Sequence, residues 1–593
     1  MDIHSLAMSD GAITSTDARV AALEAALATE RAAHAAALAV AHDRLAQVTR
    51  ERDQLRASHE QLRLELELLK RRIFVAKAER IDTAQLEMEF AEKLRQLDAL
   101  AGTLDNTDQG ATGDIAAPGA GGDQPQAKPR PTGRRNLKLL PLEEERIEIP
   151  DPLYEQLVAT GLAKRIDFEE SYKLAYKRGG FRRLVIARAK YQVVDATGQT
   201  TLDTAPVPPQ AFPRSLAAPS LLAHIVMLKY GMGMPLFRIE DQARRDGCPI
   251  DRGTMCRWVE DAGATCGATV VHAMRQEALS ASFCIATDAT GVLVQPIRTH
   301  EKVRQACRRG HYFVLVADGD HVLFEYTAKE TSDAVRAMFE GYRGYVQADA
   351  KSVYDILYRG PPHAPDEDAP CIEVACWAHL RRKYFEAAFA KSAVAREGLA
   401  RIGRIFELDA TWRHKPPADI KRLRDAHLRP HVEAFFSWAA VEYDKVRDVR
   451  GWLRSALGYA VRNKDALVRF LDDGRLLLDN NRSERALRGS IATGRKAWLF
   501  VGSDDHGQSA AHHFSLIASA RLFGLDPETY LRDLYRVLPH WPRGRYPELS
   551  PKYWAATRAR LDTDQLEKEF GPLTVPPPLD TTPQQQGAPN IAG

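Results

Sequence analysis

Apolar side chains recur every seven residues in the N-terminal part of the chain. Residues 15–82 contain no proline or glycine, and Thr16 and Asp17 are suited to cap the start of a helix. The most regular part of the repeat runs from Leu45 to Ile73. Sustained heptads predict a coiled coil and therefore self-association, whereas a long helix packed on its own chain is the alternative.

Two segments lack any apolar periodicity. Residues 102–135 are rich in Gly, Pro, Asp and Ala, and residues 570–593 are rich in Pro and Gln. Such compositions bury too little apolar surface to offset the entropy of ordering. We therefore predict a flexible linker at 102–135 and a disordered tail at 570–593.

Residues 137–205 alternate between polar and apolar positions, which predicts a β-rich segment with a hairpin turn at Gly179 and Gly180. The hairpin is basic, with interleaved aromatic residues. The cations are Lys173, Lys177, Arg178, Arg182, Arg183, Arg188 and Lys190. This composition favours a nucleic-acid surface. A solvated strand face has a similar composition and is the alternative.

Residues 215–265 show a helical pattern interrupted twice. Two helices, a short turn containing Gly247 and a third helix are typical of a helix-turn-helix. The third helix would present Arg252, Thr254 and Arg257 to a DNA groove. An ordinary helical hairpin is the alternative.

After residue 280 the pattern alternates between strands and helices. The predicted order is three strands, a helix, a strand, a helix, a strand and a helix, which indicates a mixed α/β domain. The chain becomes mainly helical again over residues 511–545.

Composition narrows the class of protein. Lys and Arg total 82 against 79 Asp and Glu, a net charge of +3 that excludes a histone-like polycation and a wholly disordered acidic chain. The seven cysteines form no C-x-x-C pair, and none precedes Cys248, which fits a reducing cytosol. We find no signal-peptide pattern and no apolar run of about 18 residues, so no membrane span is expected.

Three acids stand at positions that suit chemistry. Asp288 falls within the first predicted strand, Asp349 at the end of the fourth, and Glu484 in the first turn of a helix that follows Asn480 and Asn481. A strand acid is costly to bury unless it is paired or binds a metal, and carboxylates suit Mg²⁺ or Mn²⁺. On this pattern alone, turn and capping acids are the simpler interpretation.

Longer sequence stretches favour a catalytic role for the three acids. The chain resembles the insertion sequence 66 family of bacterial transposases over roughly residues 65–540. The resembling stretches are LLKRRIFVAKAERID (68–82), LLAHIVMLKYGMGMPLFRIEDQARRDGCPIDRGTMCRWV (221–259), ATDAT (286–290), VQADAKSVYD (346–355), CWAHLRRKYFEA (376–387), LDNNRSERALRGSIATGRKAWLFVGSDDHG (478–507) and SLIASARLFGLDPETYL (515–531).

The resemblance implies a ribonuclease H-like catalytic core over residues 280–510, with a helical insertion at about 385–470. It implies an Asp-Asp-Glu triad at Asp288, Asp349 and Glu484 that binds two Mg²⁺ (or Mn²⁺) ions. The supporting residues it suggests are Cys376 and His379, which form a C-x-x-H stretch, and Asn480 and Asn481. For His379 a supporting role is favoured over metal ligation, and a packed structural histidine is a competing interpretation.

The chain departs from the family in two places. Members usually carry a cysteine zinc module after the linker, but residues 137–205 contain no cysteine, so no cysteine-ligated zinc is expected there. Ala289 stands where the family often has Glu. Around Glu484, the cations Arg488, Arg495 and Lys496 either grip DNA phosphates or form salt bridges, and helical spacing places Arg488 on the same face as Glu484.

The functional hypothesis is a metal-dependent DNA transposase that cuts transposon-end phosphodiesters and joins the 3′-OH ends to target DNA. Its expected partners are double-stranded DNA, a second copy bound through the coiled coil, and accessory proteins of the element. The expected location is the bacterial cytoplasm, at the nucleoid. The first alternative is a non-catalytic helix-turn-helix protein dimerised by a coiled coil, and the second is a structure-specific nuclease.

Overall fold

The computed structural model describes residues 142–177, 179–194, 199–296, 306–359 and 371–579, with a few isolated residues before 142. The predicted coiled coil at 15–82 lies almost entirely outside the described residues, and the linker at 102–135 lies wholly outside them. The chain divides into two compact units, Met1–Pro125 with Ser392–Gly403, and Gln126–Lys391 with Arg404–Gly593.

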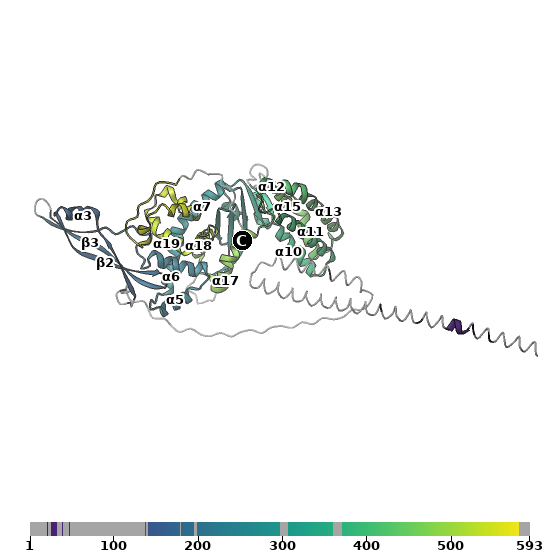
Figure 1. Ribbon diagram of the computed structural model, residues 1–593, viewed down its shortest axis with the longest axis horizontal. Coiled ribbons are helices and arrows are strands. Elements are labelled where there is room, and N and C mark those ends of the chain that lie inside the picture. Colours follow the sequence, from purple (N-terminus) through teal and green to yellow (C-terminus); the bar gives the residue numbers. More distant parts are fainter. Residues whose placement is uncertain are drawn as a thin grey trace, which may run out of the picture. The chain divides into compact units, whose positions relative to one another are not determined.

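The β-rich segment forms a four-stranded sheet built on a long hairpin (Figure 1). Strands β2 and β3 pair antiparallel around the predicted glycine turn, where Gly179 has a φ of 114° that disfavours other residues. Strands β1 and β4 both pair with β3. The strands are β1 (Glu143–Ile149), β2 (Ala163–Lys177), β3 (Gly180–Val194) and β4 (Thr200–Thr204).

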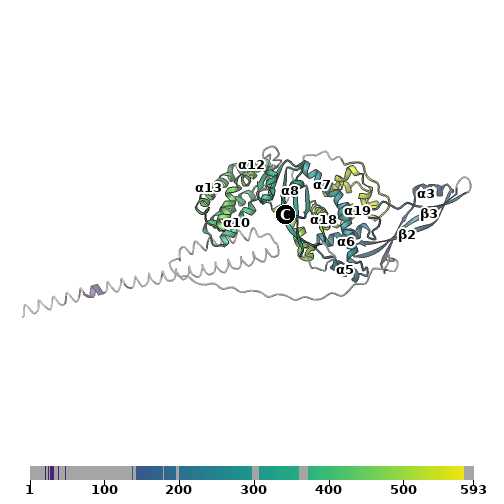
Figure 2. The ribbon, with the colours of Figure 1, turned by 180° about the vertical axis from the view of Figure 1, so that it is seen from behind.

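A short helix, α3 (Pro152–Ala159), interrupts this segment and was not expected from the sequence. The Asp151 carboxylate caps it by accepting a hydrogen bond from the Leu153 amide at 2.9 Å. Pro152 occupies the first helical position, where a missing N–H costs nothing. Both views of the ribbon show α3 beside the β2–β3 hairpin (Figure 2).

Three arginines of the hairpin form ion pairs within the segment. Strand β1 supplies Glu144 to Arg183 at 2.7 Å, and β2 supplies Glu169 to Arg188 at 2.7 Å. Arg182 contacts Glu143 and Glu145 at 3.3 Å. Strand pairing places these charges opposite one another. The nucleic-acid surface favoured by composition stays a prediction.

The four helices that follow are α4 (Pro219–Val226), α5 (Leu236–Arg245), α6 (Arg252–Ala262) and α7 (Ala268–Ala281). The predicted turn after Gly247 separates α5 from α6, and Asp251 caps α6 through the Gly253 and Thr254 amides. Helix α6 continues into α7 through a π-helical turn, Gly263–Gly267. The helices lie where the sequence predicts them, while the helix-turn-helix and its DNA-binding role stay predictions.

A six-stranded sheet forms the centre of the fold, in the order β7-β6-β5-β8-β9 with β10 beside β5. The first three strands are an antiparallel meander, and β8, β9 and β10 run parallel to their neighbours. The strands are β5 (Cys284–Val294), β6 (Arg308–Ala317), β7 (His321–Thr327), β8 (Tyr345–Ala348), β9 (Ile372–Ala375) and β10 (Phe500–Val501). The observed order confirms the mixed α/β expectation, with α8 (Ser332–Met338) and α9 (Asp355–Tyr358) as connections.

Helices alone occupy the interval from β9 to residue 471, where a helical insertion was expected. They are α10 (Trp377–Phe389), α11 (Ala393–Ala410), α12 (Pro417–Leu423), α13 (Arg429–Val446), α14 (Trp452–Arg462) and α15 (Lys464–Val468). The buried Trp377 is their centre, because its indole N–H donates to the Leu467 carbonyl at 2.7 Å and its ring packs against Phe435 and Phe470.

The C-terminal helices are α16 (Asn481–Leu487), α17 (Thr493–Trp498), α18 (Asp504–Leu522), α19 (Pro527–Val537), α20 (Pro551–Arg558) and α21 (Thr563–Glu567). Helix α18 covers the edge strand β7. Its Ser515 and Ser519 hydroxyls accept hydrogen bonds from the Phe324 and Val322 amides at 2.8 and 3.0 Å. These bonds satisfy donors that an open sheet edge would expose.

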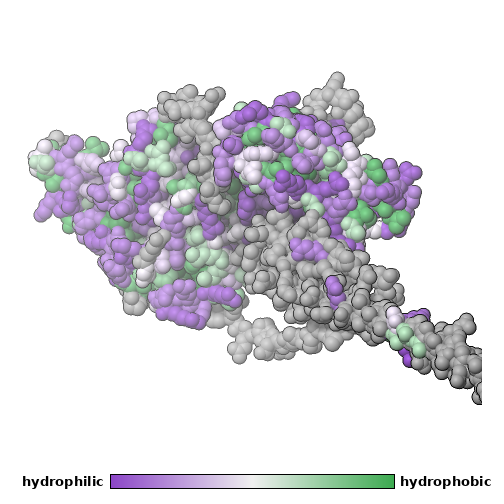
Figure 3. All heavy atoms as spheres, turned by 45° about the vertical axis from the view of Figure 1, so that its right-hand side comes forward, coloured by the Kyte–Doolittle hydropathy of each residue, from purple (hydrophilic) through white to green (hydrophobic). Residues whose placement is uncertain are grey.

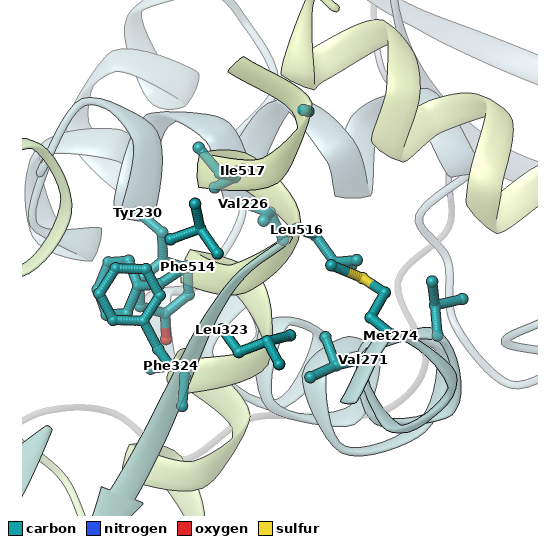
Figure 4. Packing of buried hydrophobic residues seen from close by; sticks show 14 of the residues in the cluster. Val226, Tyr230, Val271, Met274, Leu323, Phe324, Phe514, Leu516 and Ile517 are labelled. Carbon is teal, nitrogen blue, oxygen red and sulfur yellow. The ribbon is translucent and has the colours of Figure 1, made fainter. Parts of the chain in front are cut away.

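Apolar side chains from segments far apart in the sequence pack around α18. Figure 4 shows Phe514, Leu516 and Ile517 of α18 packed with Leu323 and Phe324 of β7. Side chains of α4 and α7 complete the cluster in the same view (Figure 4). Helix α18 therefore fastens the early helices onto the sheet that carries the first candidate acid.

The tail prediction is wrong for its first ten residues. Phe570 is buried, and Arg536 donates to the carbonyls of Gly571 and Pro572 at 3.0 and 3.1 Å. The Arg536 guanidinium offers five donors, and these backbone carbonyls supply acceptors that composition does not reveal. Residues 580–593 lie outside the described residues.

The outer surface is mostly hydrophilic on the face drawn in Figure 3, where apolar residues form small separate patches. Across the part of the chain that the structure describes, every helix is too short or too polar to cross a lipid bilayer.

Replacing Glu277 with Gln is expected to destabilise the fold by about 2 kcal/mol, the scale of charge-assisted hydrogen bonds. Glu277 of α7 accepts hydrogen bonds from Lys552 and Tyr553 of α20 at 2.6 and 2.7 Å, and it lies 3.4 Å from His321. Burial raises the pKa of Glu277, but these donors outweigh burial and lower it to about 2. Its ionised form therefore stabilises the fold above about pH 4.5, and this contribution is lost as the pH falls towards 2.

Thermal melts between pH 3 and 7 test this expectation. The wild-type melting temperature should fall more steeply with acid than that of Glu277→Gln, so that the two curves converge. A constant difference across the range would contradict the role of the Glu277 charge.

Candidate active site

Strand pairing brings Asp288 and Asp349 to equivalent positions. In the parallel pair β5–β8 the last registered partners are Ala286 and Gln347, and each acid lies two residues further along its strand direction. Neighbouring strands lie about 4.8 Å apart, so the two carboxyl groups stand at the same level of the sheet. Asp349 comes directly after β8, and Ala350 behind it adopts a φ of 56° that turns the chain away.

Asn480 fixes the helix that carries Glu484 to the strand that carries Asp288. Its side-chain amide donates to the Thr287 carbonyl at 2.7 Å, and its backbone N–H donates to the Cys376 sulfur at 3.1 Å. Helix α16 begins at the next residue, so Glu484 lies in its first turn, as predicted. One buried asparagine therefore links β5, the start of α10 and the start of α16.

Electrostatics show that the three acids share one environment. Burial, together with the nearby charges of Asp349 and Glu484, raises the pKa of Asp288 to about 6, against a lowering hydrogen bond from the Ala289 amide. Like charges close together disfavour ionisation in this way. The three acids named from the resemblance thus influence one another, although 61 and 135 positions separate them in the sequence.

Two of the acids face cations of the same chain. Lys351 lies 3.1 Å from Asp349, and Arg488 donates to Glu484 at 2.8 Å. Arg382 lies 3.6 Å from the other oxygen of Glu484. Burial lowers the pKa of Lys351, but attraction to Asp349 and Glu330 outweighs burial and raises it overall. For Arg488, the salt-bridging alternative is therefore present in this structure.

Cys376 and His379 occupy different surroundings at the start of α10. Cys376 is fully buried, and burial raises the pKa of its thiol to about 12, which keeps it a neutral acceptor for Asn480. The His379 Nε2 lies 3.8 Å from Glu484. Burial lowers the pKa of His379 even though Asp349 and Glu484 act in the opposite direction. A neutral imidazole beside Glu484 suits the supporting role expected for this residue.

The three carboxylates have the donor chemistry of a magnesium site. In the described ranges, however, no three His, Cys, Asp or Glu side chains are gathered closely enough to hold a metal ion as they stand. Lys351 and Arg488 form ion pairs with carboxylate oxygens of Asp349 and Glu484 that a metal ion would need. Hard carboxylate oxygens and mutual repulsion fit a divalent cation, provided that these two ion pairs open.

The remaining predicted site residues lie in three places. Arg252 and Arg257 are exposed on α6, and Arg257 donates to the Thr254 hydroxyl at 3.1 Å. Arg495 of α17 donates to the Thr290 hydroxyl at 3.1 Å and so holds α17 against β5. Lys496 beside it is exposed.

Asn481 opens α16, and its backbone amide donates to the Asp479 carboxylate at 3.1 Å. This bond lies beside the Asn480 contacts and fixes the turn that leads to Glu484.

Sequence reasoning missed three residues around Asp349, namely Tyr459, Lys351 and Glu330. The Tyr459 hydroxyl of α14 donates to the Asp349 carbonyl at 3.1 Å, so the helical insertion contacts the site directly. Glu330 lies 3.6 Å from Lys351. Lys351 stands two residues after Asp349 and could have been noticed from its position. Tyr459 and Glu330 carry no comparable signal.

Comparison with known proteins places the chain in a family. A family model described as "Transposase IS66 family" matches residues 214–509, and one described as "IS66 C-terminal element" matches residues 515–551. The uncharacterized protein y4qI of Sinorhizobium fredii is 28% identical over 439 residues, covering 73% of this chain and 79% of that protein. The uncharacterized protein y4hP of the same organism is 25% identical over 400 residues, covering 64% and 69%.

Proposed function

The chain belongs to the IS66 family of transposases, and we propose that it cuts the ends of its element and joins them to target DNA with the help of two divalent metal ions. The observation that carries this proposal is that Asp349, at a strand end, and Glu484, on a helix, lie close enough to the buried Asp288 for their charges to raise its pKa. A non-catalytic DNA-binding protein gains nothing from burying Asp288 beside Asp349 and Glu484, because such burial costs stability.

The residues proposed to hold the metal ions are Asp288, Asp349 and Glu484. Two bound Mg²⁺ or Mn²⁺ ions would lower the pKa of an attacking water or 3′-hydroxyl and stabilise the departing 3′-oxygen. No Ser, Tyr or Cys nucleophile is required, which suits a site whose one cysteine is buried and neutral.

The cations around the acids are proposed to bind the scissile phosphate. Arg382 and Arg488 lie on either side of Glu484, and a guanidinium grips a phosphate through two parallel hydrogen bonds. Lys351 supplies a point charge next to Asp349. In the absence of DNA these cations pair with the acids, so substrate phosphates and metal ions would bind by exchanging with the same ion pairs.

Asn480 and Tyr459 are proposed to position the acids. The Asn480 amide fixes the distance between β5 and α16, and the Tyr459 hydroxyl steadies the backbone of Asp349. The exposed cations of α6, Arg252 and Arg257, are proposed to contact DNA outside the active site. Self-association through residues 15–82, accessory proteins of the element and a location at the bacterial nucleoid also remain proposals.

An assay of cleavage and joining tests the proposed function. The full chain is incubated with duplex DNA that carries the sequence flanking its gene, together with a labelled target plasmid, and with Mg²⁺, Mn²⁺ or EDTA. With Mg²⁺ or Mn²⁺ we expect nicks with 3′-OH ends, followed by joined products. With EDTA we expect neither product. Cleavage without joining would indicate a nuclease, and the absence of cleavage in both metals would contradict an enzyme.

A further inference from the structure

The ammonium group of Lys351 lies between two carboxylates. Its Nζ is 3.1 Å from the Asp349 Oδ2 and 3.6 Å from the Glu330 Oε1. The backbone amide of Lys351 also donates to the Asp349 Oδ1 at 3.3 Å. Lys351 therefore contacts both oxygens of one candidate acid, and a divalent ion that binds the Oδ2 has to displace the ammonium group.

The nearer oxygen of Glu330 is an unused hydrogen-bond acceptor. Glu330 follows β7 and directly precedes Thr331, the residue that caps α8. Its Oε1 is buried and accepts no hydrogen bond from the residues that the structure describes. A buried carboxylate oxygen without a donor costs stability. A shift of roughly 0.7 Å would bring the Lys351 ammonium group from 3.6 Å to hydrogen-bond distance of this oxygen.

His311 of β6 contacts the other oxygen of Glu330. Its Nε2 lies 3.6 Å from the Glu330 Oε2, and β6 is held in the sheet through the pairing of His311 with Gly291 and Thr327. Burial lowers the pKa of His311, although the charge of Glu330 acts in the opposite direction. The imidazole is therefore neutral near neutral pH, and it leaves the charge of Glu330 to be balanced by Lys351.

A divalent ion changes which carboxylate Lys351 prefers. Two positive charges at Asp349 repel the ammonium group and take the oxygen that it contacts. The side chain of Lys351 is 45% exposed and has a flexible stem, so it can move, whereas Asp349 is only 9% exposed at the end of β8. Release of the ammonium group into water would leave Glu330 without its cation, and transfer to Glu330 avoids that cost.

We propose that Glu330 is a positioning residue for metal binding, because it accepts the Lys351 ammonium group when a divalent ion displaces that group from Asp349. The inference rests on the proposed function, since it places the ion at Asp349. It explains how the ion pair between Lys351 and Asp349 opens. Lys351 balances the charge of Asp349 in the absence of the ion, and Glu330 balances the charge of Lys351 in its presence.

Mn²⁺ binding to the full chain without DNA, measured by electron paramagnetic resonance of the free ion, tests this exchange without requiring cleavage. We expect Glu330→Gln to weaken binding roughly tenfold, because the displaced ammonium group loses its second partner. Lys351→Met should strengthen binding, because the ion no longer competes with a cation. Asp349→Asn should lose the bound ion, and full binding by this variant would place the ion elsewhere and overturn the inference.

A double-variant cycle separates transfer from the long-range attraction of one charge. Long-range attraction, like a general folding defect, predicts the same loss for Glu330→Gln in the wild-type and Lys351→Met backgrounds. Transfer predicts a loss that is at least about threefold larger when Lys351 is present. Equal losses in the two backgrounds would overturn the proposal.

Asp333→Asn is the matched control, because it removes an exposed carboxylate three residues from Glu330. We expect it to change the Mn²⁺ affinity by less than about twofold, as an exposed charge is screened by solvent. A Glu330→Gln effect no larger than this control would show that the ammonium group moves into water, and the proposal would be wrong.

The two proposals fail in distinguishable ways. A chain that shows this coupling between Glu330 and Lys351 but never cleaves DNA would retain the exchange and lose the transposase function. A chain that cleaves and joins, yet shows equal losses in both backgrounds or binds no Mn²⁺ without DNA, would do the reverse.

Discussion

Alanine at Asp288, Asp349 or Glu484 is expected to slow cleavage of element-end DNA by roughly 10³-fold or more. Each acid would be a ligand of the metal ions that stabilise charge on the scissile phosphate, and that stabilisation amounts to several kcal/mol. Binding of the same DNA, measured by fluorescence anisotropy, should change little, because phosphate contacts elsewhere dominate affinity. An alanine variant that cut at the wild-type rate would remove its residue from the triad.

Asp288→Asn separates lost chemistry from lost folding. Because burial raises the pKa of Asp288 to about 6, its ionised form at pH 7.5 costs stability of up to about 3 kcal/mol without metal. Asparagine keeps the shape and removes the charge. We therefore expect a metal-free variant that melts at a higher temperature than wild type yet does not cleave. A lower melting temperature would contradict the account of Asp288 as a buried, like-charged acid.

Removing Arg424 is expected to cost about 3–5 kcal/mol, the largest single effect on stability that we predict. Arg424 and Asp409 are both buried and lie 2.8 Å apart in the helical insertion. Arg424 also donates to the carbonyls of Phe470 and Leu476 at 2.8 and 2.9 Å. Its loss leaves a buried carboxylate and buried carbonyls without their donor.

Denaturant titrations of Arg424→Met, Asp409→Leu and the double variant measure this effect. The double variant should be more stable than Arg424→Met alone, because it removes the uncompensated charge. Additive losses would show that the pair does not interact. Arg404→Met, at an exposed position on the neighbouring helix α11, is the control and should cost less than about 0.5 kcal/mol.

Local patterns were sufficient to predict the elements of this fold but not their contacts. Alternation and turn residues located the hairpin at Gly179 and the strand that holds Asp288, because these signals act over a few residues. The ion pairs of Arg182, Arg183 and Arg188 depend on which strands lie beside β3, and composition does not contain that information. The short helix α3 was not predicted, because its start at Asp151 and Pro152 lies between stronger strand signals.

For the candidate site, too, the sequence identified residues but not the contacts between them. The resemblance to a known family identified Asp288, Asp349 and Glu484 as candidate acids. In the structure, the charges of the other two acids raise the pKa of Asp288. The resemblance could not identify Tyr459, which lies 110 residues from Asp349 in the sequence and donates a hydrogen bond to its carbonyl. It also could not show that Lys351 and Arg488 form ion pairs with Asp349 and Glu484. Such contacts arise only when distant segments pack, and a hydroxyl or an ammonium leaves no periodic trace in a sequence.

The position of α18 also sets the order in which the active site can form during translation. Ser515 and Ser519 close the edge of β7, so the sheet beneath Asp288 lacks its cover until residue 522 has left the ribosome. At about 5–20 residues per second, synthesis from Asp288 to that point takes on the order of 10–50 s. Chains that end before that point would therefore carry the exposed cations of α6 without the complete fold around the site that is proposed to cut DNA.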